Sequence, residues 1–326
     1  MQHELTAWNT MTGIQAYRLT ETGPDDPEFA EKRRAGIGGS DIAAILGLNP
    51  WKGPMDVFLE KTGRVTVPMN EKMKWGKLLE EPVAQEYAER TGRKVQRVNA
   101  ILQSIDHPVA LANVDRLLIP SATDSGKKNG ILEVKTTGWG ASWADNQVPD
   151  FYYCQHQWYG GVTRLTWGSF ATLIGGNDLV IPPDINMDFH FFEDMVVQAE
   201  RFWHDNVEKN TPPQIGKNDS TQGLKLLYGH NRLGESITLP DTFIPIIEER
   251  KRLNSLISKA EGEKKNIDRQ ILSLMKDAQY AIAGSHKVTR VVSEKATVDS
   301  ARLKLEFPDV YSKLLKLNTA IYPLYR

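Results

Sequence analysis

Three charged residues near the middle of the chain have the types and the spacing of a hydrolytic site. Glu133 and Lys135 are two positions apart in ILEVKT, so in a β-strand both side chains would lie on one face and the apolar ones on the other. Asp115 ends the segment ANVD, and antiparallel pairing through the turn SATDSGKKN would bring it beside Glu133. Paired carboxylates bind hard cations such as Mg²⁺, and a nearby lysine can hold a water or stabilise charge on a phosphate. The arrangement therefore favours phosphodiester hydrolysis.

Two further polar side chains could join this group. Glu80 lies in a helix expected over 74–91, where it shares a face with apolar neighbours, and Glu81 is its immediate rival. Gln155 lies in a segment crowded with aromatic residues, where an inward amide needs hydrogen-bond partners. Each of these side chains could instead be solvated, and the Glu-x-Lys pattern could be an ordinary cross-strand ion pair. The residues alone leave these alternatives open.

A glycine-rich turn, Gly-Gly-Ser-Asp, could bind an anion. Ser40 lies in this turn, directly before the short apolar segment IAAILG. It could simply cap a helix, or the turn could present backbone amides to a phosphate. Arg33 and Arg34 lie just upstream and would complement the negative charge.

Hydrophobic periodicity predicts the elements that must position these residues. Short helices are expected over 27–34, in IAAILG and in MDVFLEKTG, and a longer one over 74–91. The period then changes to two, and three antiparallel strands are predicted in VNAILQSI, PVALANVDRLLIP and GILEVKTTG. A helix in PDFYYCQHQWYGG, strands in RLTWGSFATLI and DLVI, and a long helix in FHFFEDMVVQAERFWHDNVEKN follow. The body of the chain is therefore expected to be mixed α/β.

The C-terminal part is expected to be a separate, mainly helical extension. Apolar residues follow heptad spacing over 243–276, namely Leu253, Ile257, Ala260, Ile267, Ile271 and Leu274. From residue 251 onward there are 15 lysines and arginines against 8 acidic residues, although the whole chain has a net charge of -1. We predict a core over 1–215, a linker over 216–240, and a coiled-coil-like helix with a small basic module over 241–326. A hairpin in YAIAGSHKVTRVV and a broken helix in SARLKLEFPDVYSKLLK are expected within this module.

Composition excludes several classes of protein. With 326 residues, 40% of them hydrophobic and 25% charged, the chain resembles ordinary globular proteins and not fibrous or disordered ones. It has no signal-peptide pattern and no apolar run near the roughly 18 residues of a membrane helix, so we expect a cytoplasmic protein without a membrane partner. A single cysteine, Cys154, excludes an internal disulfide and cysteine-rich metal sites, and the 7 histidines show no metal-binding spacing.

Taken in order, these segments resemble the YqaJ viral recombinase, or lambda exonuclease-like, family within the PD-(D/E)XK nuclease superfamily. The resemblance is carried by RRAGIGGSDIAAILGLNPWKGPMDVFLEKTG, WGKLLEEPVAQEYAERTG, HPVALANVDRLL, GILEVKT, YYCQHQWYGGVT and ERFWHDNVEKNTPP. These segments span about residues 30–214, and the first and last are more specific than the acidic motif. The resemblance implies that the core over 1–215 is a PD-(D/E)XK nuclease with a restriction-endonuclease-like α/β fold, a mixed central sheet flanked by helices.

The resemblance also implies roles for the acidic group. Asp115, Glu133 and the carbonyl of Val134 would bind a catalytic Mg²⁺, for which Mn²⁺ could substitute. Glu80 would be the helix carboxylate that completes the metal site. Lys135 would orient or activate the attacking water.

Further roles follow from the same resemblance. Gln155 matches the motif glutamine that places a water or the phosphate. Ser40 and one upstream arginine match a pocket for the 5′ phosphate of DNA. Arg34 keeps the family's spacing to the glycine that follows and Arg33 keeps the spacing to Ser40, so both remain candidates. Glu81 likewise remains a rival for the helix carboxylate.

The implied function is a Mg²⁺-dependent exonuclease that digests double-stranded DNA from 5′ to 3′ during phage-type homologous recombination. A phage or prophage origin in a bacterial cell is expected. The implied partners are double-stranded DNA, a phage single-strand annealing protein, and further copies of the chain in a trimeric ring. Two alternatives stay open. One is a RecB-like or restriction-type DNA endonuclease with the same residues, and the other is a catalytically inactive DNA-binding or coiled-coil interaction protein.

Overall fold

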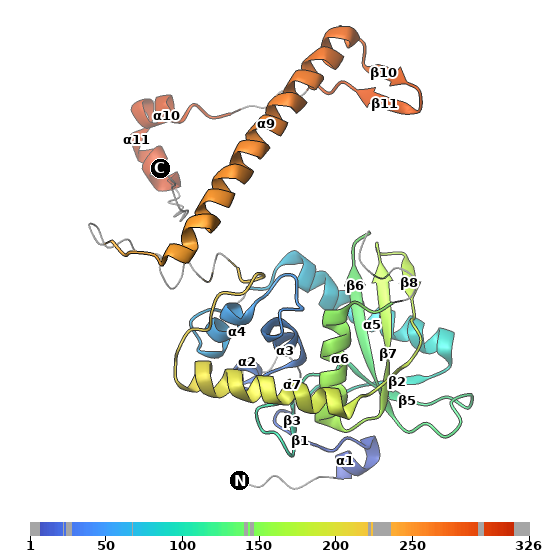
Figure 1. The fold of residues 1–326 in the computed structure, drawn as a ribbon. Helices are drawn as coiled ribbons and strands as arrows, with labels where there is room; N and C mark the ends of the chain where they lie inside the picture. Colours follow the sequence, from blue (N-terminus) through green and yellow to red (C-terminus); the bar gives the residue numbers. More distant parts are fainter. Residues whose placement is uncertain are drawn as a thin grey trace. The chain divides into compact units, whose positions relative to one another are not determined.

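A computed structural model describes residues 7–21, 23, 28–66, 68–139, 143, 147–220, 223, 236–292 and 297–315. The chain divides into two compact units, Met1–Gly229 and His230–Arg326 (Figure 1). None of the described helices is both long enough and apolar enough to span a lipid bilayer.

The first unit is built on a mixed central sheet. Its six strands are β2 (Lys94–Arg97), β5 (Arg116–Ile119), β6 (Gly130–Thr137), β7 (Trp167–Ile174), β8 (Asp178–Val180) and β9 (Ile185–Asn186). The order is β2-β5-β6-β7-β8, and β9 pairs with the other end of β7. Only β6 and β7 run parallel, whereas every other pair in this sheet is antiparallel. The strand that carries Glu133 and Lys135 is therefore interior, which gives it partners on both edges.

The first unit also contains a smaller antiparallel sheet. It is formed by β1 (Ala16–Arg18), β3 (Leu102–Ser104) and β4 (Leu111–Ala112). The prediction of a single strand in PVALANVDRLLIP is wrong. The extended segment is interrupted between β4 and β5, and its two halves join different sheets. β4 is held in the small sheet by β3 and by the backbone of Ile37, whose carbonyl accepts from the N–H of Leu111 at 2.8 Å. The break leaves Asp115 at the entrance to β5.

Helices cover both faces of the central sheet. They are α1 (Ala7–Thr12), α2 (Phe29–Arg34), α3 (Gly39–Ile45), α4 (Pro54–Lys61), α5 (Glu71–Thr91), α6 (Asp150–Thr163) and α7 (Phe189–Phe202), which continues as a π-helical turn η2 (Trp203–Glu208). Buried side chains of α5 pack on Leu132 and Val134 of β6. Ile131, on the opposite face of the strand, belongs to the core formed with α3, α6 and α7. Glu133 and Lys135 alternate with Leu132 and Val134, so they face the α6 side.

The helices expected from periodicity are present. The longest helix of this unit, α5, begins at Glu71, three residues before the expected start, because the side chain of Asn70 caps it by accepting from the N–H of Met73 at 2.9 Å. It ends at Thr91, where Gly92 adopts the left-handed conformation with φ 69°.

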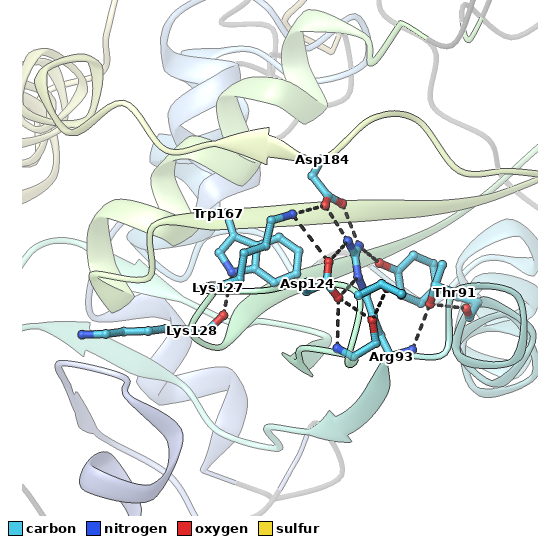
Figure 2. Close-up of polar contacts among 10 residues, drawn as sticks. Thr91, Arg93, Asp124, Lys127, Lys128, Trp167 and Asp184 are labelled. Carbon is cyan, nitrogen blue, oxygen red and sulfur yellow. Dashed lines mark hydrogen bonds and ion pairs between the residues drawn. The ribbon is translucent and has the colours of Figure 1, made fainter.

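An ion-pair network fixes the turn between β5 and β6 (Figure 2). The guanidinium of Arg93 binds Asp124 at 2.7 Å and Asp184 at 2.6 Å, and it lies over the ring of Trp167 at 4.8 Å. Lys127 binds Asp184 at 2.6 Å and lies 4.3 Å from the centre of the same ring. Because Asp124 and Lys127 belong to the turn, the network holds the β5–β6 hairpin to the rest of the sheet.

The second unit is mainly helical. Its elements are η3 (Asp241–Phe243), α9 (Ile244–Met275), the hairpin of β10 (Tyr280–Ala283) and β11 (His286–Thr289), α10 (Ser300–Glu306) and α11 (Pro308–Leu314). The expected long helix, hairpin and broken helix are all present. Within α9, the heptad residues Leu253, Ile257 and Ile267 are exposed.

Candidate active site

The carboxylates of Asp115 and Glu133 meet where β5 begins beside β6. The antiparallel register pairs Arg116 with Leu132, so the next position along the ladder sets Asp115 opposite Glu133. The backbone N–H of Val134 donates to Oδ2 of Asp115 at 2.9 Å, which holds the aspartate against β6. The hairpin thus brings together the two acidic residues that the sequence pattern singled out.

Lys135 is the cation of this group. Its Nζ donates to Oε1 of Glu133 at 2.6 Å and lies 4.7 Å from the centre of the Tyr152 ring. Glu133 is 2% exposed and Lys135 17%, so this pair is not an exposed surface ion pair. Burial and the charge of Glu133 raise the pKa of Asp115 well above its usual range, and burial also raises the pKa of Glu133.

The pKa of Lys135 follows from the same charges. Burial alone would lower the pKa of Lys135, but the carboxylates of Glu133 and Asp115 outweigh burial and raise it. One ammonium therefore faces two largely buried carboxylates, and the group has an excess of negative charge whenever both are ionised.

Gln155 of α6 points into the site. Its Nε2 donates to Oε1 of Glu133 at 2.7 Å and to the hydroxyl of Tyr159 at 3.0 Å, and Nζ of Lys135 reaches its Oε1 at 3.5 Å. Oε1 of Glu133 thus accepts two hydrogen bonds, whereas its buried Oε2 has no hydrogen-bond partner in the described part of the chain. A buried carboxylate oxygen without a partner is costly, and a bound cation is one group that would satisfy it.

Arg116 binds both candidate glutamates of α5. Its guanidinium, 3% exposed, binds Oε1 of Glu80 and also binds Oε2 of Glu81 at 2.9 Å. Glu81 is held by Arg97 as well, at 2.6 Å. Burial is the main cause of the raised pKa values of Asp115 and Glu133, and the charge of Glu80 raises both further. Glu80 therefore lies close enough to act on the acidic group.

The donor set suits a divalent cation with few protein ligands. Among the described residues, no group of three or more His, Cys, Asp and Glu side chains is arranged to hold a metal ion. Asp115 and Glu133 form a pair, and Glu80 is turned toward Arg116. Mg²⁺ usually binds proteins through one or two carboxylates and keeps several waters. The two carboxylates and the unsatisfied Oε2 of Glu133 therefore fit Mg²⁺.

Gly39, the neighbour of Ser40, packs against the helix that carries Gln155. A Cβ on Gly39 would come within 2.8 Å of Cγ of Gln155 and of Cε1 of Tyr159, so α3 packs directly on the part of α6 that contacts Glu133. The capping residue of α3 is Gly38, and Ser40 is in the first turn of the helix instead of capping it. Oγ of Ser40 is 3.5 Å from Nη2 of Arg33.

Sequence reasoning missed several residues that the structure brings to the site. Arg116 was a charged residue in an otherwise apolar strand, a signal that could have marked it as a buried partner for acidic residues. Tyr152 and Tyr159 belong to the aromatic run of α6 and carried no specific signal. Asp41 is 1% exposed, and a charged residue at the start of an apolar helix could have indicated a buried ion pair.

Fold and site define a mixed α/β protein with a buried carboxylate and lysine centre, and comparisons with known proteins agree on its family. A sequence model of the YqaJ-like viral recombinase domain matches residues 28–166, a range that contains every candidate residue above. The chain is 38% identical over 299 residues to the uncharacterized protein YqaJ of Bacillus subtilis (strain 168), covering 89% of this chain and 90% of that protein. The chain belongs to the YqaJ family.

Solved structures also resemble this one. The alkaline exonuclease LHK-Exo from Laribacter hongkongensis gives a TM-score of 0.46 with 16% sequence identity, over 57% of this chain and 94% of that one. A second structure, LHK-Exo in complex with dAMP, gives the same values.

Proposed function

We propose that this chain is a Mg²⁺-dependent exonuclease that digests double-stranded DNA from 5′ to 3′ during phage-type homologous recombination. The observation that carries the proposal is the meeting of Asp115, Glu133 and Lys135, with Gln155 directed at the same carboxylate. The match to the YqaJ-like viral recombinase domain supports a role in recombination.

Asp115, Glu133 and the carbonyl of Val134 would hold the metal, with Glu80 completing the site and Mn²⁺ able to substitute. When bound, Mg²⁺ supplies a Lewis acid that stabilises charge on the phosphate and makes a bound water more acidic. Glu80 is favoured over Glu81 because it is close enough to act on the acidic pair, whereas Glu81 is bound by two arginines.

Lys135 and Gln155 would act on the water and the phosphate. The carboxylates around Lys135 favour its charged form, in which Nζ donates hydrogen bonds and cannot accept a proton. Lys135 would therefore orient the attacking water and stabilise the negative charge that develops on the phosphate oxygens. Gln155 would fix the orientation of Glu133 and place the water or the phosphate beside it.

The direction of digestion would be set by a pocket for the 5′ phosphate next to this centre. Ser40 and Arg33 are the residues we favour, because Arg33 contacts Ser40 and Gly39 packs against the site. Arg34, the last residue of α2, is the second candidate, and both arginines are exposed. A guanidinium and a hydroxyl together suit a terminal phosphate dianion.

The C-terminal unit would assist the nuclease without contributing to the catalytic centre. We propose a core over 1–215, a linker over 216–240 and an assembly or DNA-retention module over 241–326. The exposed heptad residues of α9 would pair with further copies of the chain, in a trimeric ring as the family resemblance implies, or pack on the core. A single-strand annealing protein would take over the strand that digestion exposes.

Digestion of end-labelled DNA tests the function. Linear duplexes labelled at the 5′ or the 3′ end and a covalently closed circle are incubated with Mg²⁺ or with EDTA. We expect metal-dependent release of the 5′ label from linear DNA and an intact circle. Cutting of the circle would favour the endonuclease alternative, and binding without any cleavage would favour the inactive DNA-binding protein.

A further inference from the structure

A buried cluster of charges lies at the start of α3. Asp41 is 1% exposed, and its two carboxylate oxygens bind Nζ of Lys52 at 2.9 Å and Nζ of Lys61 at 2.7 Å. Lys61 is 3% exposed and Lys52 is 18% exposed. Burial alone would raise the pKa of Asp41, but the two lysines outweigh it and hold the pKa well below its usual range. Asp41 is therefore a buried anion with two cationic partners.

Asp41 ties together the segments around Ser40. Its Oδ2 accepts from the N–H of Gly38 at 3.1 Å, which fixes the turn before Ser40. Lys61, held by the same oxygen, donates to the backbone carbonyl of Arg33 at 3.0 Å and so holds the end of α2. The residue that carries the guanidinium and the turn that carries the hydroxyl are thus both anchored to one carboxylate.

Lys52 is the more accessible lysine of the cluster. It lies in the loop between α3 and α4, where Nζ binds Glu60 at 2.6 Å in addition to Asp41. An ammonium has three N–H donors, so one donor remains after these two bonds. With Arg33 included, three cations and two carboxylates leave the cluster with one positive charge in excess. The cluster is therefore able to accept an anion.

We infer that Asp41 is the positioning residue of the 5′-phosphate pocket, holding Arg33 beside Ser40 through Lys61, and that Lys52 is the pocket's second cation. The inference rests on the proposed function. It deepens that proposal by assigning selectivity for a terminal phosphate to residues outside the acidic centre. Asp41 itself stays buried and does not touch the DNA.

Stability alone explains this cluster poorly. Replacing a buried ion pair by apolar residues of similar volume is often neutral or stabilising, so such a pair is weak evidence of a purely structural role. The cluster is also linked to the acidic centre. Gly39, two positions before Asp41, packs on Gln155 and Tyr159. An anion bound at Ser40 would lie next to the site where we place phosphodiester hydrolysis.

Kinetics on matched DNA ends test the inference in the full-length chain. The variants are Asp41→Asn and Lys52→Met, and the control is Lys32→Met, which removes an exposed charge from α2. Rates are measured on linear duplexes with 5′-phosphate or 5′-hydroxyl ends. Binding of the same duplexes is measured by fluorescence anisotropy in a Lys135→Met background, and folding is measured by thermal unfolding.

We expect the wild type and Lys32→Met to prefer phosphorylated ends. Asp41→Asn and Lys52→Met should each raise KM and Kd for phosphorylated ends about tenfold. The kcat values, and the KM and Kd values for hydroxyl ends, should stay within about twofold of the wild type. Lys52→Met keeps the pair of Asp41 with Lys61, so it decides the question if Asp41→Asn fails to fold.

An unchanged preference in a folded Lys52→Met chain would overturn the inference, as would an active wild type that does not distinguish the two ends. A wild type that cleaves no DNA but binds phosphorylated ends more tightly would contradict the proposed function and leave the pocket intact.

Discussion

At the scale of single residues, Glu133 lies at the centre of the proposed catalytic site. Its carboxylate is buried, binds Lys135 and Gln155 through one oxygen, and keeps the other without a partner among the described residues. Asp115 stands beside it, so two acidic groups compete for one ammonium. Such a conflict is unfavourable in an apolar core but is useful where a divalent cation supplies the missing charge.

The two neighbouring glutamates of α5 offer a matched comparison. Glu80→Gln should lower kcat by about 10- to 100-fold and raise the Mg²⁺ concentration needed for half-maximal activity, because this carboxylate would complete the metal site. Glu81→Gln should change both quantities by less than about threefold, because Glu81 is bound to Arg97 and Arg116. Mg²⁺ titrations of nuclease activity measure the difference, and a larger defect in Glu81→Gln would reverse the assignment.

His156 predicts part of the pH dependence of stability. Burial lowers its pKa to about 3, and the ring packs on Phe170. The unfolded chain takes up this proton near the ordinary pKa of about 6.5, so between these values the unfolded state binds more protons than the folded state. The free energy of unfolding should therefore fall as the pH falls from about 6.5 toward 3, on the order of 1.4 kcal/mol per pH unit for this residue.

Replacement by Leu isolates this effect. The free energy of unfolding of His156→Leu, measured by urea titration at several pH values, should fall less steeply with acid than that of the wild type. Equal slopes in the two proteins would show that His156 does not contribute.

At the scale of elements, the packing of α3 on α6 connects the proposed anion pocket to the acidic centre. Gly39 allows this contact because it has no side chain. Gly39→Ala should destabilise the protein by about 1–3 kcal/mol and lower nuclease activity, since the new Cβ would push on Gln155 and Tyr159. Gly76→Ala is the control. Its Cβ would meet its nearest neighbour at 3.6 Å, and alanine in a helix should stabilise by about 0.5–1 kcal/mol. Thermal unfolding measures both, and a stable, fully active Gly39→Ala would contradict the close packing.

The hairpin could be predicted from the sequence and the surroundings of the acidic pair could not. Asp115 and Glu133 lie on the two arms of one hairpin, so alternation and antiparallel pairing are enough to bring them together. The contact of Arg116 with Glu80 spans 36 positions and depends on how α5 docks on the sheet, which periodicity does not specify. The strand break before Asp115 was missed for a similar reason, because the sequence does not show that Ile37 pairs with Ala110, directly before β4.

The cluster at Asp41 shows the same limit. Its partners come from a loop and from the end of another helix, and local spacing gives no reason to group them. The identity of the cap also needed the structure, because Gly38 and Ser40 are both acceptable capping residues at the start of α3.

At the scale of the whole molecule, the two faces of α9 predict two separable functions. Leu253, Ile257 and Ile267 lie on one exposed face of the helix, whereas Lys251, Lys265 and Arg269 lie on the opposite side by its 3.6-residue period. Ile257→Asp should abolish self-association and leave cleavage of short duplexes unchanged. Replacing the three basic residues by Ala should weaken DNA binding. It should also lower the number of ions released on binding, measured from the salt dependence of the affinity, by about one per lost phosphate contact.

Light scattering and salt-dependent anisotropy measure these two effects, and exposed Glu248→Gln serves as a control. A chain ending at Pro240 should show both losses and still cleave short DNA in the presence of metal. If that chain folded but cut nothing, the C-terminal unit would have to contribute to the catalytic centre.

We propose that Glu133 and Lys135 form the catalytic centre of a DNA nuclease. Single-turnover digestion of a 5′-phosphorylated duplex with Mg²⁺ tests it most directly, comparing the wild type with Glu133→Gln and Lys135→Met, with exposed Lys94→Met as the control. Both variants should keep the thermal transition and DNA binding of a folded protein, while their rates fall by about 100- to 1,000-fold or more. Near wild-type rates in either folded variant would contradict the account.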